Sequence, residues 1–204
     1  MKEHILNKAI EMFLSLGFKS VTMDDIAAEM GISKKTIYLH YSNKDTLVKA
    51  VTSNLFETIS SGIDAIITAN TNPIEEWFKI KDFVMLNLKN ENTSPLYQLQ
   101  KYYPKIHQSL SVKQFNKMGC CVIENLNKGI CQGLYRENLN KELISRFYFA
   151  SMTSIKNVEL FDPLLYSSNA VQTCYLEYHL RGICTLKGIE ILDQILTQNH
   201  QKQI

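Results

Sequence analysis

Three residues within positions 22–41 restrict the fold of this chain more than any other feature of its sequence. Gly31 follows Ala27 by four positions, and Ile37 follows Gly31 by six. A small residue at 27 lets two helices cross closely, a glycine at 31 permits the left-handed backbone of a tight turn, and Ile37 fills the space between the helices. This spacing predicts a helix-turn-helix, with Ala27 on its first helix and Ile37 on its second.

Polar residues around this motif predict where its helices begin. Thr22 and Asp25 form the pattern of a capping box, so a short helix is expected to begin after Thr22. Ser33 is a favourable cap for the second helix of the motif. Ser42 or Asn43 can cap a further helix that follows directly. Three short helices and the start of a fourth therefore fall within the first 45 residues.

The rest of the chain is expected to be helical as well. Only 8 Gly and 4 Pro occur among 204 residues, which favours long helices over many turns and short strands. Apolar residues recur at spacings of three and four along most of the chain. These patterns predict helices over residues 5–16, 44–70, 110–135, 141–160 and 169–198, a helix from Pro73 to the polar stretch 90–94, and a kink or break at Pro104. The fold class is therefore all-α, with one domain boundary near residue 45.

Composition and motifs exclude several classes of protein. Charged residues interrupt the first twenty positions and no 18 consecutive residues are apolar, so we expect a cytoplasmic protein without a membrane partner. Cys120 and Cys121 are adjacent and lack the spacing of a zinc site, and no metal or cofactor is predicted. No glycine-rich phosphate loop, no nucleophile elbow and no catalytic grouping is present, so we expect no enzyme activity.

The charges of the helix-turn-helix favour a DNA partner, although the net charge of +2 does not. Residues 30–44 contain three lysines and one histidine and no acid. The second helix of such a motif lies in the major groove with its first residues at the base edges. Ser33, Lys34, Lys35 and Thr36 are therefore the candidates for base readout. The candidates for phosphate contact are Tyr38, His40, Tyr41 and Lys44, together with the backbone of the helix that begins at Thr22.

Residues 5–50 resemble the N-terminal domain of the tetracycline-repressor (TetR) family of bacterial transcription regulators. The stretch TMDDIA at 22–27 resembles the family's second helix, and GISKKTIY at 31–38, with Tyr41, Lys44 and Leu47 after it, resembles its turn, recognition helix and fourth helix. The resemblance implies a helix-turn-helix DNA-binding domain at 1–45 and a larger helical ligand-binding and dimerisation domain at 46–204. It implies a homodimeric repressor that binds a palindromic operator in double-stranded DNA and is released by a small-molecule effector.

Two further sets of residues are candidates within the larger domain. Aromatic and neighbouring side chains at helical spacing either line an effector pocket or form plain core. This set is Trp77, Phe83, Tyr102, Tyr103, His107, Phe115, Met118 and Phe147. Gly182 and Gly188 each cost a helix about 1 kcal/mol, which close packing between subunits or within one subunit would offset. In the family, the last two helices form the dimer interface, which here implies Phe147, Tyr175, His179, Gly182, Ile183 and Leu186.

Two alternatives to a ligand-released repressor stay open at this point. A protein of this fold can be an activator or can need a co-repressor, because the sign of regulation depends on operator position and on the conformer that the effector prefers. A helical scaffold that has lost operator binding is the second alternative, which the near-neutral net charge favours.

Overall fold

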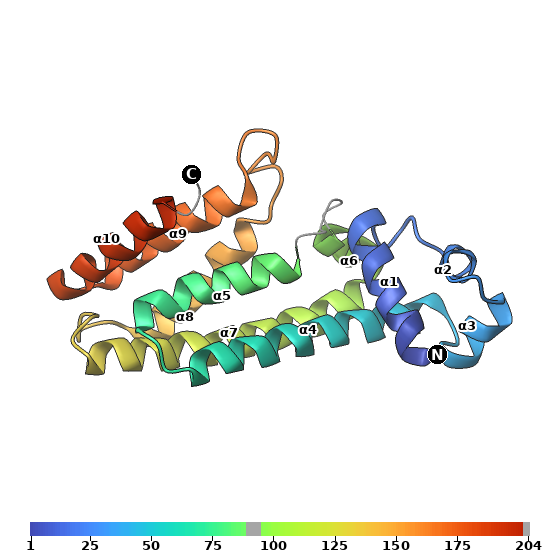
Figure 1. Ribbon diagram of the computed structural model, residues 1–204, viewed down its shortest axis with the longest axis horizontal. Helices are drawn as coiled ribbons and strands as arrows, with labels where there is room; N and C mark the ends of the chain where they lie inside the picture. Colours follow the sequence, from blue (N-terminus) through green and yellow to red (C-terminus); the bar gives the residue numbers. More distant parts are fainter. Residues whose placement is uncertain (89–94, 202–204) are drawn as a thin grey trace. The chain divides into compact units, whose positions relative to one another are not determined.

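The computed structural model describes residues 1–88 and 95–201. Within these residues the chain forms ten α-helices, which confirms the predicted all-α fold (Figure 1). The helices are α1 (Lys2–Leu16), α2 (Met23–Glu29), α3 (Lys34–His40), α4 (Lys44–Thr68), α5 (Pro73–Asn87), α6 (Pro95–Tyr102), α7 (Pro104–Cys131), α8 (Lys141–Ser154), α9 (Ser168–Ile183) and α10 (Leu186–Gln201). No helix within the two described ranges is both long and apolar enough to cross a membrane.

The helices form two compact units, each with its own core. Unit 1 consists of Met1–Ser61 and Leu86–Gln114, and unit 2 consists of Gly62–Met85 and Phe115–Ile204. Long helices α4 and α7 contribute residues to both units. The boundary predicted after residue 45 divides the chain by function, into a DNA-binding and a ligand-binding domain, and not by packing. It stays a prediction.

The core of unit 1 is built on the amphipathic helix α1. Its predicted apolar face buries Ile5, Ala9 and Phe13 completely. Ile26 of α2 and Ile37 of α3 are also fully buried in the same cluster. Because burial of each such side chain contributes roughly 1.5–3 kcal/mol, this small cluster holds three short helices that could not persist alone.

Helix α6 completes unit 1 by covering the end of α1. Gly17 ends α1 with a φ of 88°, a backbone conformation that favours glycine. The side chain of Gln98 lies directly over this glycine, where any Cβ would meet it, and its Oε1 accepts a hydrogen bond from the Lys19 N–H at 2.9 Å. Leu99 of α6 is 1% exposed and packs into the core of unit 1.

The core of unit 2 contains a buried chain of polar side chains. Trp77 Nε1 donates to the Tyr135 hydroxyl at 3.1 Å, and that hydroxyl donates to Asn125 Oδ1 at 3.0 Å. The Asn125 amide in turn donates to Glu76 Oε1 at 2.8 Å, and Glu76 is 1% exposed. Burial raises the pKa of Tyr135 well above its ordinary value. Each of these groups has a partner, so the chain of hydrogen bonds fixes how α5, α7 and the segment after α7 pack.

Helix α7 differs from its predicted range. The sequence predicts a helix over 110–135, whereas α7 runs from Pro104 to Cys131. The predicted break at Pro104 is confirmed, because α6 ends at Tyr102 and α7 begins at Pro104. Proline is favourable at the first helical position because its missing N–H has no partner there in any case. The polar stretch expected at 90–94 lies outside the described residues.

Helix α8 is shorter than predicted. The sequence predicts a helix over 141–160, but α8 ends at Ser154. Beyond it, Asn157 Oδ1 accepts from the Glu159 N–H and Asp162 Oδ1 accepts from the Leu164 N–H, both at 2.9 Å. These side chains offer the backbone local turns in place of a continued helix.

The single helix predicted over 169–198 is wrong, because the chain breaks between α9 and α10. Cys184 is extended, with a ψ of 152°, and the Thr185 N–H donates to the Leu134 carbonyl at 2.9 Å. Thr185 Oγ1 then accepts from the Gly188 N–H at 3.2 Å and so caps α10. A Cβ at Gly188 would lie 2.2 Å from the Leu134 carbonyl oxygen. The close packing at Gly188 is therefore within the subunit.

Candidate functional site

Side-chain caps fix the start of both helices in the predicted motif. Thr22 Oγ1 accepts from the Asp25 N–H at 3.1 Å, and Asp25 Oδ2 accepts from the Thr22 N–H at 2.8 Å, which confirms the capping box. The hydrogen bond from the Thr22 backbone, and then that from its side chain, lower the pKa of the Asp25 carboxyl. Ser33 Oγ accepts from the Thr36 N–H at 3.1 Å at the start of α3. At the next helix, Asn43 Oδ1 accepts from the Thr46 N–H at 2.8 Å, so Asn43 provides the cap.

The turn between α2 and α3 has the geometry that the spacing predicts. Gly31 has a φ of 63°, and no atom lies within 4 Å of where its Cβ would be. The backbone conformation, and not a lack of space, is therefore what favours glycine here. Ala27 is 5% exposed and Ile37 is fully buried, and α2 contacts α3 directly. In Figure 1, α1, α2 and α3 lie together at the N-terminal end of the chain.

One face of α3 is exposed and carries no acid. Lys35 and His40 are exposed, Tyr38 is 43% exposed, and Leu39 is 74% exposed. Lys35 makes no hydrogen bond or ion pair with any residue in the described ranges. Leu39 was not among the residues that the sequence singled out, because an apolar residue inside a helix ordinarily indicates core. Its exposure provides an apolar contact on a face that is otherwise polar and basic.

Lys34 lies on the same helix but already has a partner. Its Nζ is 2.6 Å from Asp24 Oδ2 of α2. The hydrogen bond to Asp24 raises the pKa of Lys34. Both side chains are more than half exposed, so this pair contributes little to stability. It does, however, reduce the positive potential that Lys34 offers to a nucleic acid.

Tyr41 and Lys44, which the sequence predicts as phosphate contacts, direct their polar atoms toward backbone carbonyls at the start of α1 and just beyond its end. Tyr41 is 3% exposed, burial raises the pKa of its phenol, and its hydroxyl lies 3.5 Å from the Lys2 carbonyl. Lys44 Nζ lies 3.3 Å from the Lys19 carbonyl, and desolvation lowers its pKa. Their side chains hold the end of α3 and the start of α4 against α1, so their position differs from that of the exposed residues of α3.

The eight predicted pocket residues fall into both units. Tyr102, Tyr103 and His107 belong to unit 1, where Tyr103 packs against Phe18. The remaining five belong to unit 2: Trp77, Phe83, Phe115, Met118 and Phe147. Trp77 is 4% exposed and lies in the core, whereas Phe147 is 60% exposed.

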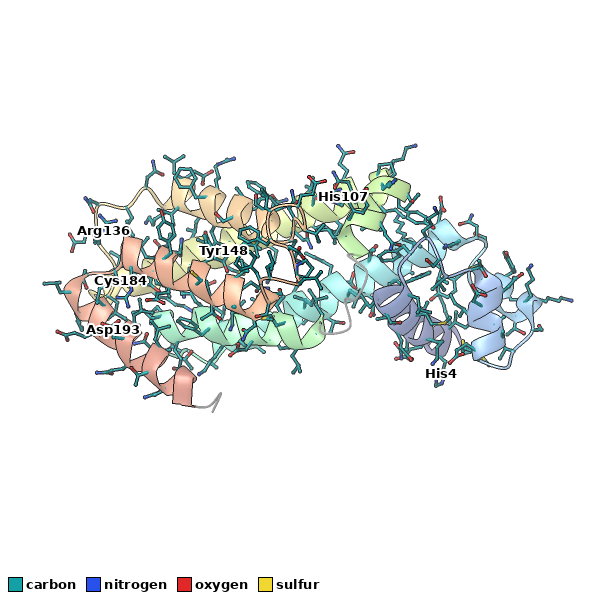
Figure 2. The ribbon with its side chains drawn as sticks, turned by 90° about the horizontal axis from the view of Figure 1, so that it is seen from above. His4, His107, Arg136, Tyr148, Cys184 and Asp193 are labelled. Atoms are coloured by element: carbon teal, nitrogen blue, oxygen red, sulfur yellow. The ribbon has the colours of Figure 1, made fainter. Side chains whose placement is uncertain are left out.

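An aromatic cluster in unit 2 surrounds one histidine. The ring of His179 lies 5.3 Å from the rings of Trp77 and Tyr148 and 5.8 Å from that of Tyr175, measured between centroids (Figure 2 labels Tyr148). His179 is 8% exposed, and its Nε2 is buried without a hydrogen-bond partner. Burial lowers the pKa of His179 to about 4, so its ring is neutral at pH 7. The sequence did not single out Tyr148, although Tyr148 lies one helical turn before Met152, which is half-buried and packs against the same core.

The six residues predicted for a dimer interface differ in exposure. Phe147 is 60% exposed, Leu186 is 86% exposed and Gly182 has no atom near its would-be Cβ. His179 and Ile183 are buried inside the subunit, and Tyr175 is half-buried. Of the six, only Phe147, Gly182 and Leu186 are therefore open to direct contact with a second subunit. Within the described residues, no group of three or more His, Cys, Asp or Glu side chains is arranged to hold a metal ion.

Comparison with known proteins decides the family. The family model for bacterial regulatory proteins of the tetR family matches residues 5–51, which contain the whole helix-turn-helix. The HTH-type transcriptional repressor KstR2 of Mycolicibacterium smegmatis is 24% identical over 191 residues, which are 92% of each chain. The chain belongs to the tetR family. It is thus a DNA-binding transcriptional regulator of the TetR family and not an enzyme.

Other relatives of this TetR-family chain extend the match beyond the DNA-binding part. YvaF of Bacillus subtilis, an uncharacterized HTH-type transcriptional regulator, is 28% identical over 161 residues, which are 78% of this chain and 83% of YvaF. A protein from Saccharomonospora viridis, solved in complex with choline, is 15% identical and superposes with a TM-score of 0.73 over 90% of this chain and 97% of its own. That likeness concerns the fold.

Proposed function

We propose that this TetR-family protein is a repressor that binds a palindromic operator as a homodimer and is released by a small molecule. The observation that carries the proposal is the exposed, acid-free face of α3 on a motif whose turn and caps are in place. Two such helices, one from each subunit, would enter successive major grooves about 34 Å apart. The relative KstR2, which is named a repressor, supports the sign of regulation.

The residues of α3 take different roles in this proposal. Ser33, Lys35 and Thr36 lie at or near the start of α3, where side chains reach base edges. Lys34 would contribute once Asp24 releases it. Tyr38 and His40 contact phosphates, and exposed Leu39 contacts a thymine methyl group. Backbone N–H groups at the start of α2, directly after Thr22, would face a phosphate, whereas Tyr41 and Lys44 position α3 from behind.

The effector would bind in unit 2 beside the aromatic cluster of Trp77, Tyr148, Tyr175 and His179. The buried Nε2 of His179 needs a polar partner, and a ligand that supplies one would gain a hydrogen bond worth about 0.5–1.5 kcal/mol. The surrounding rings offer an apolar and π-rich surface. A partly apolar molecule with one polar or cationic group fits this chemistry, as choline does in the protein from Saccharomonospora viridis. Binding would favour a conformer whose paired α3 helices no longer match the operator.

A DNA-binding isotherm tests the proposal. The purified protein is titrated with fragments of its own genome and with random duplex DNA at several salt concentrations. A repressor binds a specific fragment at least about 1,000-fold more tightly than random DNA, and its affinity falls steeply with salt. Equal and weak affinity for all fragments would contradict the proposal and favour a scaffold without operator binding. An activator would bind specifically but raise transcription from a reporter that carries the bound fragment.

A further inference from the structure

A groove between α4 and α7 in unit 1 has the composition of an anion site. Its volume is about 260 Å³, and it lies outside the motif that the DNA-binding proposal uses. The residues that line it are Lys49, Thr52, Ser53, Lys105, Ile106, Ser109, Leu110 and Lys113. Three lysines therefore surround one small concave surface, and no acidic side chain lines it.

The two helices present these side chains in regular rows. On α7, Lys105, Ser109 and Lys113 follow one another at intervals of four residues, so they lie along one face. On α4, Lys49 and Ser53 have the same interval and face the groove from the other side. Since a helix rises 1.5 Å per residue, the two α7 lysines are attached about 12 Å apart along its axis. The groove thus matches an elongated ligand better than a single small ion.

The lysines of the groove lack the partners that other lysines have. Lys49 and Lys105 make no hydrogen bond or ion pair with the residues of either described range, and Lys113 lies 5.6 Å above the Phe56 ring. In contrast, Lys8 and Lys34 of the same unit are paired with carboxylates at 2.9 and 2.6 Å. Three positive charges without a carboxylate partner repel one another on one concave surface, and an anion between them would remove that cost.

The rest of the lining determines which kind of anion fits. Ser53 and Ser109 offer hydroxyl donors, while Ile106 and Leu110 add an apolar surface that has nothing to offer a bare inorganic ion. A phosphate group carries a charge of about −1.5 to −2 at pH 7, so one or two phosphates balance three lysines. We propose that this groove binds a small phosphorylated organic molecule, whose phosphates meet the lysines and whose body lies on Ile106 and Leu110.

Calorimetric titration of the full-length protein with inorganic pyrophosphate tests the proposal. The experiment is done at 150 mM salt and without DNA. We expect saturable binding of one pyrophosphate per chain.

The double variant Lys105→Gln with Lys113→Gln should weaken pyrophosphate binding by about tenfold or more, because two charge-assisted hydrogen bonds are lost. The control variant Lys156→Gln with Lys187→Gln removes two exposed charges from unit 2 and should leave the affinity within about twofold. ADP and fructose 1,6-bisphosphate then distinguish a nucleotide from a sugar phosphate as the source.

Three results would overturn the proposal. The first is an absence of saturable binding by pyrophosphate, ADP and fructose 1,6-bisphosphate alike, and the second is an equal loss in the control variant, which would indicate general charge attraction. The third is a groove variant that binds DNA more weakly in the absence of any added phosphate, which would assign the lysines to the DNA backbone instead. Circular dichroism melts show whether each variant is folded, and glutamine has nearly the helix propensity of lysine. Because the titration contains no DNA, its failure leaves the repressor proposal standing.

Discussion

Single residues of α3 differ in how available they are to DNA. Lys34 and Lys35 are adjacent in sequence, yet the first is bound to Asp24 at 2.6 Å and the second has no partner in the described part of the chain. An ion pair must be broken before Lys34 can neutralise a phosphate or meet a base. We therefore expect Lys35 to contribute more to DNA binding than Lys34, although the sequence predicts both as base contacts.

We expect Lys35→Gln to weaken operator binding by about tenfold and to narrow the difference in affinity between operator and random DNA, because Lys35 meets a base edge in the proposal. Lys34→Gln should have a smaller effect, since Asp24 already neutralises part of its charge. Fluorescence anisotropy with labelled operator and labelled random duplex DNA measures both quantities, and Lys156→Gln is the control for a lost charge in unit 2. An effect of Lys34→Gln larger than that of Lys35→Gln would show that the ion pair with Asp24 does not persist on DNA.

The buried ring of His179 should make stability depend on pH. Its folded pKa of about 4 lies below the ordinary 6.5, so the unfolded chain binds a proton between these values and the folded chain does not. The free energy of unfolding should therefore fall as the pH falls from about 6.5 to about 4, by about 3 kcal/mol from this residue. Urea unfolding of the wild type and of His179→Gln measures this difference.

The exposed residue His4 provides the control for that experiment. His4→Gln should retain the whole pH dependence, whereas His179→Gln should lose the part described. Parallel curves for the wild type and His179→Gln between pH 4 and 6.5 would show that the ring is not desolvated as the structure has it.

The sequence predicts best those helix starts that a side chain caps. Thr22, Ser33 and Asn43 are capping residues with a local effect, and their helices begin where the sequence indicates. The break after α9 depends instead on Thr185, whose backbone bonds to Leu134, 51 positions earlier in the chain. Gly182 and Gly188 flank that break, but each lies inside its helix and neither has a positive φ. Tertiary contacts of this kind are not readable from periodicity, which is why one long helix is expected over 169–198.

Gly188→Ala should destabilise unit 2 although alanine is the better helix former. The new Cβ would lie 2.2 Å from the Leu134 carbonyl oxygen, so the contact between α10 and the segment after α7 must open. We expect a loss of roughly 1–3 kcal/mol in the free energy of unfolding. Gly119→Ala on α7 is the matched control, because its Cβ would sit 3.5 Å from Ser145 Oγ, an ordinary contact. It should gain roughly 0.5–1 kcal/mol, and equal stability of both variants would contradict the packing at Gly188.

At the scale of the whole molecule, the sequence predicts the DNA-binding motif well and the other sites poorly. Ala27, Gly31 and Ile37 lie within eleven positions, so local rules place them correctly. The lysine groove brings Lys49 together with residues more than 50 positions later, and the aromatic cluster joins α5, α8 and α9. How helices pair over such separations depends on packing, which neither composition nor spacing encodes.

The proposed homodimer has a direct test in unit 2. Phe147 is 60% exposed and Leu186 is 86% exposed, and burial of large apolar side chains against a second subunit would remove this surface from water. We expect the wild type to sediment at twice 23.5 kDa. Phe147→Glu should sediment as a monomer and bind DNA more weakly, because one half-site contact is lost. Leu16→Glu, at an exposed position of unit 1, should remain a dimer. A dimeric Phe147→Glu would place the interface elsewhere.

Selection of bound fragments from random duplex DNA, followed by sequencing, tests whether the protein binds an operator as a homodimer. A homodimeric repressor predicts a palindrome whose half-sites lie about one helical turn apart, since two α3 helices related by a twofold axis must enter the same side of the duplex. It also predicts that Lys35→Gln relaxes the preference at one position in each half-site. Recovery of no motif at low salt, or of an unpaired single site, would contradict a dimeric operator-binding repressor.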